Sequence, residues 1–289
     1  MKVAGVVLFL VFPAMAFSQE RQACEYHDPA WSPDSRWLAF GSNRTGVFQI
    51  FTVRKDGTGL TQITDDAAPS GGPDWSTDGR YLVFSSNRGG ERGLWTYDIE
   101  AGVTEPVDDG LGPAAAPRWS TDGRTIYYEG VAEQNRDIYR VDITTGMVNR
   151  LTSHEANDLR PVPSPDGKWL AFQSNRSGKY QLYRMPSDGG EAEALTLGDN
   201  HNAGPDWAPD GRRIVFYSAP NDDRAELQVL DVATGESTPL TANDELDYAP
   251  AWSPDGTTIA FTSQRSGRNR IYLMRLGSQE SVLLIDGCD

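Results

Sequence analysis

One phrase recurs six times along the chain, and its spacing constrains the fold more than any other feature. Its clearest copy is Ala-Pro-Ala-Trp-Ser-Pro-Asp-Gly at residues 249–256. The leading prolines of the six copies stand at positions 29, 73, 117, 161, 205 and 250. Steps this regular indicate a repeat architecture, so the 289 residues are expected to form one object rather than two domains.

Each repeat is predicted to contain four short strands. In the sixth repeat they are expected at 248–252, 258–262, 270–274 and 281–285. A Ser-Pro-Asp-Gly turn separates the first two, because proline suits its second position and glycine its fourth. The third strands alternate β-branched and aromatic residues with a period of two. The fourth strands are expected to close at the Ile-Thr or Leu-Thr pairs 63–64, 151–152, 195–196 and 240–241.

These repeats predict an all-β fold, a six-bladed β-propeller of four-stranded antiparallel blades. A single small sheet buries little and leaves bare edges, whereas six sheets around an axis cover one another. The blades are expected at about 25–66, 67–110, 111–154, 155–198, 199–243 and 244–286. The repeated Trp is expected to fill the space between blades. Position 163 holds Pro instead, which predicts looser packing or a local exchange of partners in the fourth blade.

The N-terminus has the pattern of a secretory signal peptide. Met1-Lys2 is a short positive start, residues 3–12 are continuously apolar, and small residues follow Pro13. Residues 1–18 are therefore expected to be removed, leaving 19–289 as the propeller, with cleavage after Ala16 as the alternative. An uncleaved anchor is the other possibility, although the apolar run is short for a membrane span. The expected location is the periplasm or the outside of the cell.

The chain has two cysteines, Cys24 and Cys288. In an oxidising compartment two cysteines usually pair. One precedes the first repeat and the other follows the last, and these points are neighbours in a closed ring. We therefore expect a Cys24–Cys288 disulfide at the seam, with two free thiols at the chain ends as the alternative.

The formal net charge of −15 bears on the classes of partner. Such a surface repels phosphate backbones and anionic lipid, which disfavours nucleic acid and membrane surfaces as partners. Solubility is the plain interpretation of the acidity, ahead of cation collection. The protein is expected to be a monomer without membrane insertion once the signal is cleaved.

The repeat as a whole resembles the WD40-like repeat of the TolB propeller. The elements that carry the resemblance are Pro-x-Trp-Ser-Pro-Asp-Gly, an apolar strand, Ser-x-Arg-x-Gly, Ile-Tyr-x-Met, Asp-Gly and Leu-Thr, over about residues 28–285. The repeat is also similar to those of the non-catalytic propellers of prolyl-oligopeptidase-type peptidases and of tricorn protease. The resemblance implies a six-bladed propeller, commonly periplasmic, that docks proteins or peptides at one mouth of the ring.

The resemblance has a limit at the N-terminus. TolB carries an α/β domain ahead of its propeller, which joins it to the Tol machinery. Here the first repeat follows the expected cleavage site after a few residues. The chain is therefore expected to be the propeller alone, and a role in the Tol system is in doubt.

The sequence lacks the motifs of the common catalytic sites. It has no Gly-x-Ser-x-Gly elbow, no phosphate-binding glycine loop before a helix and no zinc-type cysteine cluster. No cofactor is expected. The arginines of the repeated Ser-Asn-Arg or Ser-Gln-Arg element are interpreted as structural. Residues 129–135 and 218–223 depart from that element, and such loops either carry function or have simply drifted.

Polar residues in the segments that join one blade to the next form the candidate binding set. These segments gather at one mouth of a propeller. The candidates are His27, His154, Asp158, His201, Asn202 and Asp247. Histidines with carboxylates suit a transition metal, and the similar propeller lyases acting on oligogalacturonate use a histidine-rich metal site. Those lyases carry paired histidines in one blade, which this chain lacks, so a polar anionic rim is the favoured interpretation and no metal ligand is assigned.

The leading hypothesis is a non-enzymatic binding scaffold for a protein, a peptide or a cell-envelope component. The alternative is a metal-assisted lyase or hydrolase acting on an acidic saccharide. A third possibility, a subunit of a larger complex, predicts a large exposed apolar patch.

Overall fold

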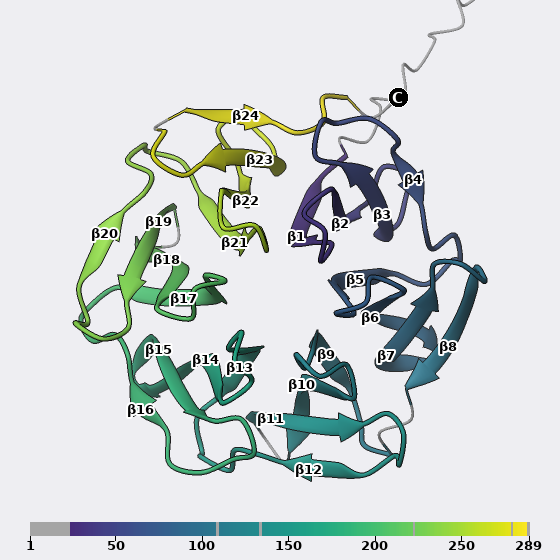
Figure 1. The fold of residues 1–289 in the computed structure, drawn as a ribbon, viewed down its shortest axis with the longest axis horizontal. Helices are drawn as coiled ribbons and strands as arrows, with labels where there is room; N and C mark the ends of the chain where they lie inside the picture. The colour runs from purple at the N-terminus through teal and green to yellow at the C-terminus, as the bar shows by residue number, and fades with distance from the viewer. Residues whose placement is uncertain (1–23, 108–109, 133–134, 222, 279, 288–289) are drawn as a thin grey trace, which may run out of the picture.

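The computed structural model describes residues 24–287 except 108–109, 133–134, 222 and 279. The predicted signal peptide at 1–18 and Cys288 lie outside the described residues. The described part consists of strands and turns, without a helix. Its strands form six sheets of four, and strands consecutive in the chain are neighbours in each sheet. The sheets surround a common axis as the blades of a propeller (Figure 1), so the predicted fold is confirmed.

Blade 1 is the sheet β1–β4, and blades 2 to 6 follow in chain order. The innermost strands are β1 (Tyr26–Trp31), β5 (Ser70–Trp75), β9 (Ala114–Trp119), β13 (Asp158–Pro163), β17 (His201–Trp207) and β21 (Asp247–Trp252). The second strands are β2 (Trp37–Ser42), β6 (Tyr81–Gly89), β10 (Thr125–Ala132), β14 (Trp169–Ser177), β18 (Arg213–Asn221) and β22 (Thr258–Ser263).

The third strands are β3 (Gln49–Arg54), β7 (Glu91–Asp98), β11 (Asn135–Asp142), β15 (Lys179–Pro186), β19 (Arg224–Asp231) and β23 (Arg270–Arg275). The outer strands are β4 (Thr61–Gln62), β8 (Val103–Val107), β12 (Val148–Arg150), β16 (Glu193–Ala194), β20 (Ser237–Pro239) and β24 (Ser281–Leu283). In such a meander the connectors between blades and the loops between second and third strands lie on one face, here called the mouth face. The other turns lie on the opposite face.

The turn after the innermost strand is Ser-x-Asp in every blade except blade 5, which has Ala208, and its own side chains fix it. In blade 6 the Ser253 hydroxyl donates to Asp255, 2.7 Å away, and accepts from the Thr258 amide at 2.9 Å. Blades 1 to 4 repeat both bonds. The short polar motif therefore sets the hairpin that returns the chain along the blade.

The outer strands end before the Ile-Thr or Leu-Thr pairs at which they were predicted to close. In these pairs the Thr hydroxyl accepts a hydrogen bond from the amide of the third strand, for example Ile50 N–Thr64 Oγ1 at 2.9 Å and Leu182 N–Thr196 Oγ1 at 2.9 Å. The Thr hydroxyl thus takes the place of the main-chain carbonyl that would accept this hydrogen bond in a continuing sheet. The predicted strand ends lie two residues too far along the chain because an apolar-Thr pair has a strand-like composition.

The repeated Trp packs between adjacent blades, as predicted. Trp207 of blade 5 is buried in one core cluster with Val162, Ala171 and Leu182 of blade 4, and its indole N–H donates to the Val162 carbonyl at 3.2 Å. Where Pro163 replaces this Trp, Tyr127 of blade 3 is buried against Leu170 and the rest of the blade 4 core. At this interface the packing partner therefore changes, with Tyr127 of blade 3 in place of the repeated Trp.

The ring closes between blades 1 and 6 (Figure 1). The Tyr26 amide donates to the Asn269 carbonyl at 3.1 Å, and the Trp31 indole donates to the Ala251 carbonyl at 3.1 Å. Near the chain ends, Cys24 Sγ lies 3.8 Å from the carbonyl oxygen of Gly287. The two ends of the described chain therefore meet at this seam.

Candidate functional site

Every innermost strand contains a bulge beside its leading proline. In blade 1 the pairing of β1 with β2 shifts register between His27 and Ala30, and equivalent shifts occur in the other five blades. The residue before each proline has a positive φ; the six are Asp28, Gly72, Ala116, Arg160, Gly204 and Ala249, with φ between 46° and 61°. A bulge re-aims side chains, here toward the axis of the ring.

Two of these six residues carry charge and meet across the axis. Asp28 belongs to blade 1 and Arg160 to blade 4, on the opposite side of the ring. Arg160 Nη1 lies 3.2 Å from Asp28 Oδ1, and both side chains keep more than a third of their surface exposed. Burial raises the pKa of Asp28, but Arg160, His27 and Arg118 together lower it more, and the net pKa is below its usual value. The channel is thus crossed by an ionised, accessible pair.

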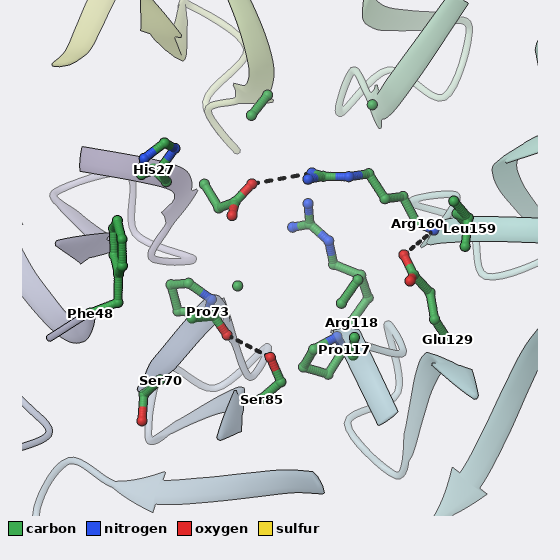
Figure 2. Close-up of a pocket in the computed structure, with 18 of the residues that line it drawn as sticks. His27, Phe48, Ser70, Pro73, Ser85, Pro117, Arg118, Glu129, Leu159 and Arg160 are labelled. Carbon is green, nitrogen blue, oxygen red and sulfur yellow. Dashed lines mark hydrogen bonds and ion pairs between the residues drawn. The ribbon is translucent and has the colours of Figure 1, made fainter. Parts of the chain in front are cut away.

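This pair lies in a cavity of about 570 Å³ at the axis of the propeller. Residues from all six blades line it, and six prolines form much of the wall. Phe48, Arg92 and Arg136 come from loops or strand ends on the mouth face, so the cavity opens there. Figure 2 shows Arg118 and Arg160 extending into the cavity, with Phe48 and His27 at its side.

The charged residues of the lining are mostly cationic. Arg92, Arg118, Arg136 and Arg160 stand against two carboxylates, Asp28 and Glu129. Arg92 donates to the Ser85 hydroxyl at 2.8 Å. In a protein of net charge −15 the wall of this cavity therefore reverses the overall sign.

Glu129 joins two of these arginines. Its Oε2 lies 3.1 Å from Arg136 Nη1, and its Oε1 accepts from the Arg160 main-chain amide at 2.9 Å. Glu129 itself is 5% exposed. It begins the 129–135 segment, the departure of blade 3 from the repeat, so this segment contributes directly to the site.

In three blades the residue after the leading proline is charged; these residues are Asp74, Arg118 and Asp206. Arg118 Nη1 is 3.2 Å from Asp74 Oδ1, and the main-chain amides of Trp119 and Trp252 donate to Asp74 and Asp206 at 2.8 and 2.6 Å. Burial raises the pKa of Asp74, and burial with repulsion from Asp74 raises that of Asp206 to about 6 despite Arg118. These acids are therefore more easily neutralised than free aspartates.

His27 connects the cavity to the seam between blades 6 and 1. Its Nδ1 lies 3.1 Å from the Tyr248 hydroxyl and its Nε2 lies 3.2 Å from Glu25 Oε2. The ring also meets Phe48 edge-on, with centroids 5.3 Å apart. Burial, Asp28 and Glu25 raise the pKa of Tyr248, so its hydroxyl remains protonated and suits hydrogen bonding rather than nucleophilic attack.

The six sequence candidates are not gathered into one group. His27 lines the cavity, and the other five lie outside its lining as far as the described residues show. His154 is exposed and accepts from the Ala156 amide, while His201 accepts from the Tyr180 amide. Asn202 of blade 5 donates to the Gln181 side chain of blade 4 at 2.8 Å.

Asp158 and Asp247 are fully buried partners of the repeated arginines. Arg176 Nη2 lies 2.9 Å from both oxygens of Asp158, and Arg265 Nη2 lies 2.8 Å from Asp247. Arg176 also stacks on Tyr183, 4.8 Å from the ring centroid. These arginines fasten the start of the innermost strand to the second and third strands, in agreement with their structural interpretation.

The described ranges contain no group of three or more His, Cys, Asp or Glu residues placed to hold a metal ion. Nor do they contain a helix long and apolar enough to cross a bilayer.

Comparison with known proteins shows the family of this propeller. The family described as TolB beta propeller domain matches residues 21–108, 93–223 and 199–285, which together span nearly all of the blades. The chain belongs to the TolB β-propeller family.

Relatives of this TolB-type propeller extend the comparison. A stretch of 39 residues is 54% identical to an uncharacterized protein of Agrobacterium fabrum and covers 13% of that protein. A structure from Agrobacterium tumefaciens assigned as TolB has 24% identity and a TM-score of 0.71 over 88% of this chain and 91% of its own. TolB of Acinetobacter baumannii has 23% identity and a TM-score of 0.70 over 89% of this chain, which spans 62% of that one.

The propeller of an oligogalacturonate lyase from Vibrio parahaemolyticus is also similar. Its identity is 16% and its TM-score 0.60, over 88% of this chain and 90% of its own. Identities at this level show a shared fold. The chemistry of this chain is therefore argued from the residues of its own cavity.

The charged cavity residues Asp28, Arg118, Glu129 and Arg160 were not among the sequence candidates. The sequence candidates were expected on the connectors, whereas the innermost strands supply most of the cavity lining. A signal for two of them is visible in the repeats. The position before the leading proline is Gly or Ala in four repeats, but Asp28 and Arg160 stand three repeats apart with opposite charge.

Proposed function

We propose that this TolB-type propeller is a non-enzymatic binding scaffold of the periplasm or the cell exterior. Its partner is a protein, a peptide or a cell-envelope component that docks at the mouth face. The single observation that carries the proposal is the open axial cavity, about 570 Å³ in volume and lined by all six blades. Concave sites with apolar walls and a few convergent polar groups are where proteins bind ligands.

The chemistry of the lining favours binding over turnover. The Tyr248 hydroxyl is held protonated, and the arginines are already paired or hydrogen-bonded. Such groups orient and neutralise a partner but do not make a nucleophile with its base.

Site-specific photo-crosslinking tests the proposal. A photoreactive phenylalanine analogue replaces Phe48, which lines the cavity at the mouth face. The matched control replaces Thr145, which is exposed in a turn on the opposite face. We expect adducts with an envelope component from position 48 and none from position 145. Adducts from position 145 alone, or equally from both, would contradict docking at the mouth.

The metal-assisted lyase or hydrolase on an acidic saccharide gains no support from the described residues, which hold no candidate metal group. It remains open to a direct measurement. Bound transition metal in the purified protein, together with saccharide turnover that is lost in His201→Ala, would favour it over the scaffold.

A further inference from the structure

We propose that the axial cavity captures the carboxylate groups of an acidic peptide segment on Arg118 and Arg160, and that Asp28 holds this place in the unbound protein. The inference rests on the proposed function, since it names the chemistry of the partner that docks at the same mouth. Four steps carry it.

The first step is the local charge. The cavity wall presents four arginines and two carboxylates, although the whole chain carries a net charge of −15. At physiological ionic strength charges are screened beyond about 8 Å, so a bound group responds mainly to the wall beside it. Among the described ion pairs, Arg118, Arg136 and Arg160 each have a carboxylate partner and Arg92 has none. An anion that enters the cavity therefore still meets a wall of net positive charge.

The second step is that Asp28 occupies an arginine without saturating it. The pair is a single contact of 3.2 Å between one oxygen and one nitrogen, and the Arg160 side chain is 39% exposed. A guanidinium has five donors in a fork that suits two-point binding of a carboxylate. Arg118 lines the same cavity, and Figure 2 shows it extending inward as Arg160 does, so an incoming carboxylate can be offered a second guanidinium.

The third step is the strained geometry that holds Asp28 and Arg160 on the axis. Both have positive φ, 50° and 51°, a conformation that L-residues with side chains rarely adopt. The equivalent residues in the other four blades are Gly or Ala, which leave the axis open. The side chains of Asp28 and Arg160 thus lie on the axis, where a partner would enter the cavity.

The fourth step separates peptide from saccharide. Six prolines, Phe48 and Leu159 give the wall a large apolar share. Apart from His27, its neutral hydrogen-bonding side chains are Ser70, Ser85 and Asn87, all from blade 2. A saccharide presents hydroxyls all around its rings, which would leave many unpaired against this wall at a cost in affinity. A peptide with acidic and apolar side chains matches both parts of the lining.

Fluorescence anisotropy with two labelled peptides tests the inference. One alternates glutamate and alanine, and the other has glutamine at every glutamate. We expect the wild-type protein to bind the glutamate peptide about tenfold more tightly, with the preference falling as salt rises. Asp28→Asn should tighten binding of the glutamate peptide about three- to tenfold, because it removes the internal competitor.

Arg160→Gln should lower affinity for the glutamate peptide to that for the glutamine peptide. The matched control is Arg80→Gln, because Arg80 pairs with Asp98 away from the cavity, and it should bind as the wild type does. If Arg160→Gln does not fold, as thermal melts would reveal, the double variant Asp28→Asn/Arg160→Gln removes both charges together. It must also lose the preference for glutamate.

The outcomes separate this inference from the proposed function. Equal affinity for both peptides, or an unchanged preference in Arg160→Gln, would overturn carboxylate capture while leaving peptide docking intact. Failure of both peptides to bind at about 1 mM, with trigalacturonate binding instead through Arg160, would overturn the inference and the peptide form of the proposed function together.

Discussion

At the scale of single residues, Asp206 has the most informative titration. Its Oδ2 accepts a 2.6 Å hydrogen bond from the Trp252 amide, but burial and the nearby Asp74 raise its pKa to about 6. A carboxyl whose pKa is raised on folding binds its proton more tightly in the folded state. It therefore lowers the free energy of unfolding progressively as the pH rises from about 4 to about 6, and the loss persists above that.

Asp206→Asn should relieve this penalty. An amide oxygen can still accept from the Trp252 amide, and no charge is buried. We expect the variant to be more stable than wild type by about 1–2 kcal/mol at pH 8, with the difference vanishing near pH 4. Urea unfolding at both pH values checks this. A variant that is destabilised equally at both would show that the hydrogen bond, rather than the charge, dominates at this position.

At the scale of the blades, the packing between blades 3 and 4 depends on Tyr127, which takes the place of the repeated Trp. Tyr127 stands where the other second strands carry Ala or Val, and it faces the blade whose phrase has Pro163. We expect Tyr127→Ala to cost about 3 kcal/mol, because it opens a cavity that no indole fills. Adding Pro163→Trp should recover part of the loss, since it restores the pairing found at Trp207.

Thermal unfolding of the single and double variants measures this coupling. Tyr127→Phe is the control, because it keeps the ring and should cost much less. If the effects of Tyr127→Ala and Pro163→Trp on the free energy of unfolding simply add, the two side chains do not occupy the same space between the blades.

Most of each blade was predictable because its signals are local. Period-two alternation, the Ser-x-Asp turn and the spacing of Trp252 and its equivalents each act within one repeat. The cavity was not predictable in the same way, because Asp28 and Arg160 are 132 residues apart and meet only when the ring closes. Asp158 was predicted as a binding residue because it is acidic and was expected on a connector. In the structure it is buried and forms an ion pair with Arg176.

At the scale of the whole molecule, a covalent link between the two chain ends would stabilise the closed ring. Cys24 lies beside Gly287, next in the chain to Cys288, which lies outside the described residues. We propose the Cys24–Cys288 disulfide and expect Cys24→Ser to lower stability by about 2–5 kcal/mol, because a bridge over so long a loop restricts the unfolded chain most.

Thiol titration in denaturant and melts with and without reductant measure this bridge. The bridge predicts no free thiol in the oxidised protein and a melting temperature that reductant lowers to that of Cys24→Ser. Two titratable thiols per chain would rule out the seam disulfide.

The account as a whole depends on the axial cavity as the binding surface of this TolB-type propeller. A crystal structure of the protein with the glutamate–alanine peptide tests it most directly. We predict a peptide carboxylate within hydrogen-bonding distance of Arg118 and Arg160, with Asp28 displaced from Arg160. A peptide bound on the face opposite the mouth face or along the outer strands, with the Asp28–Arg160 pair intact, would contradict it.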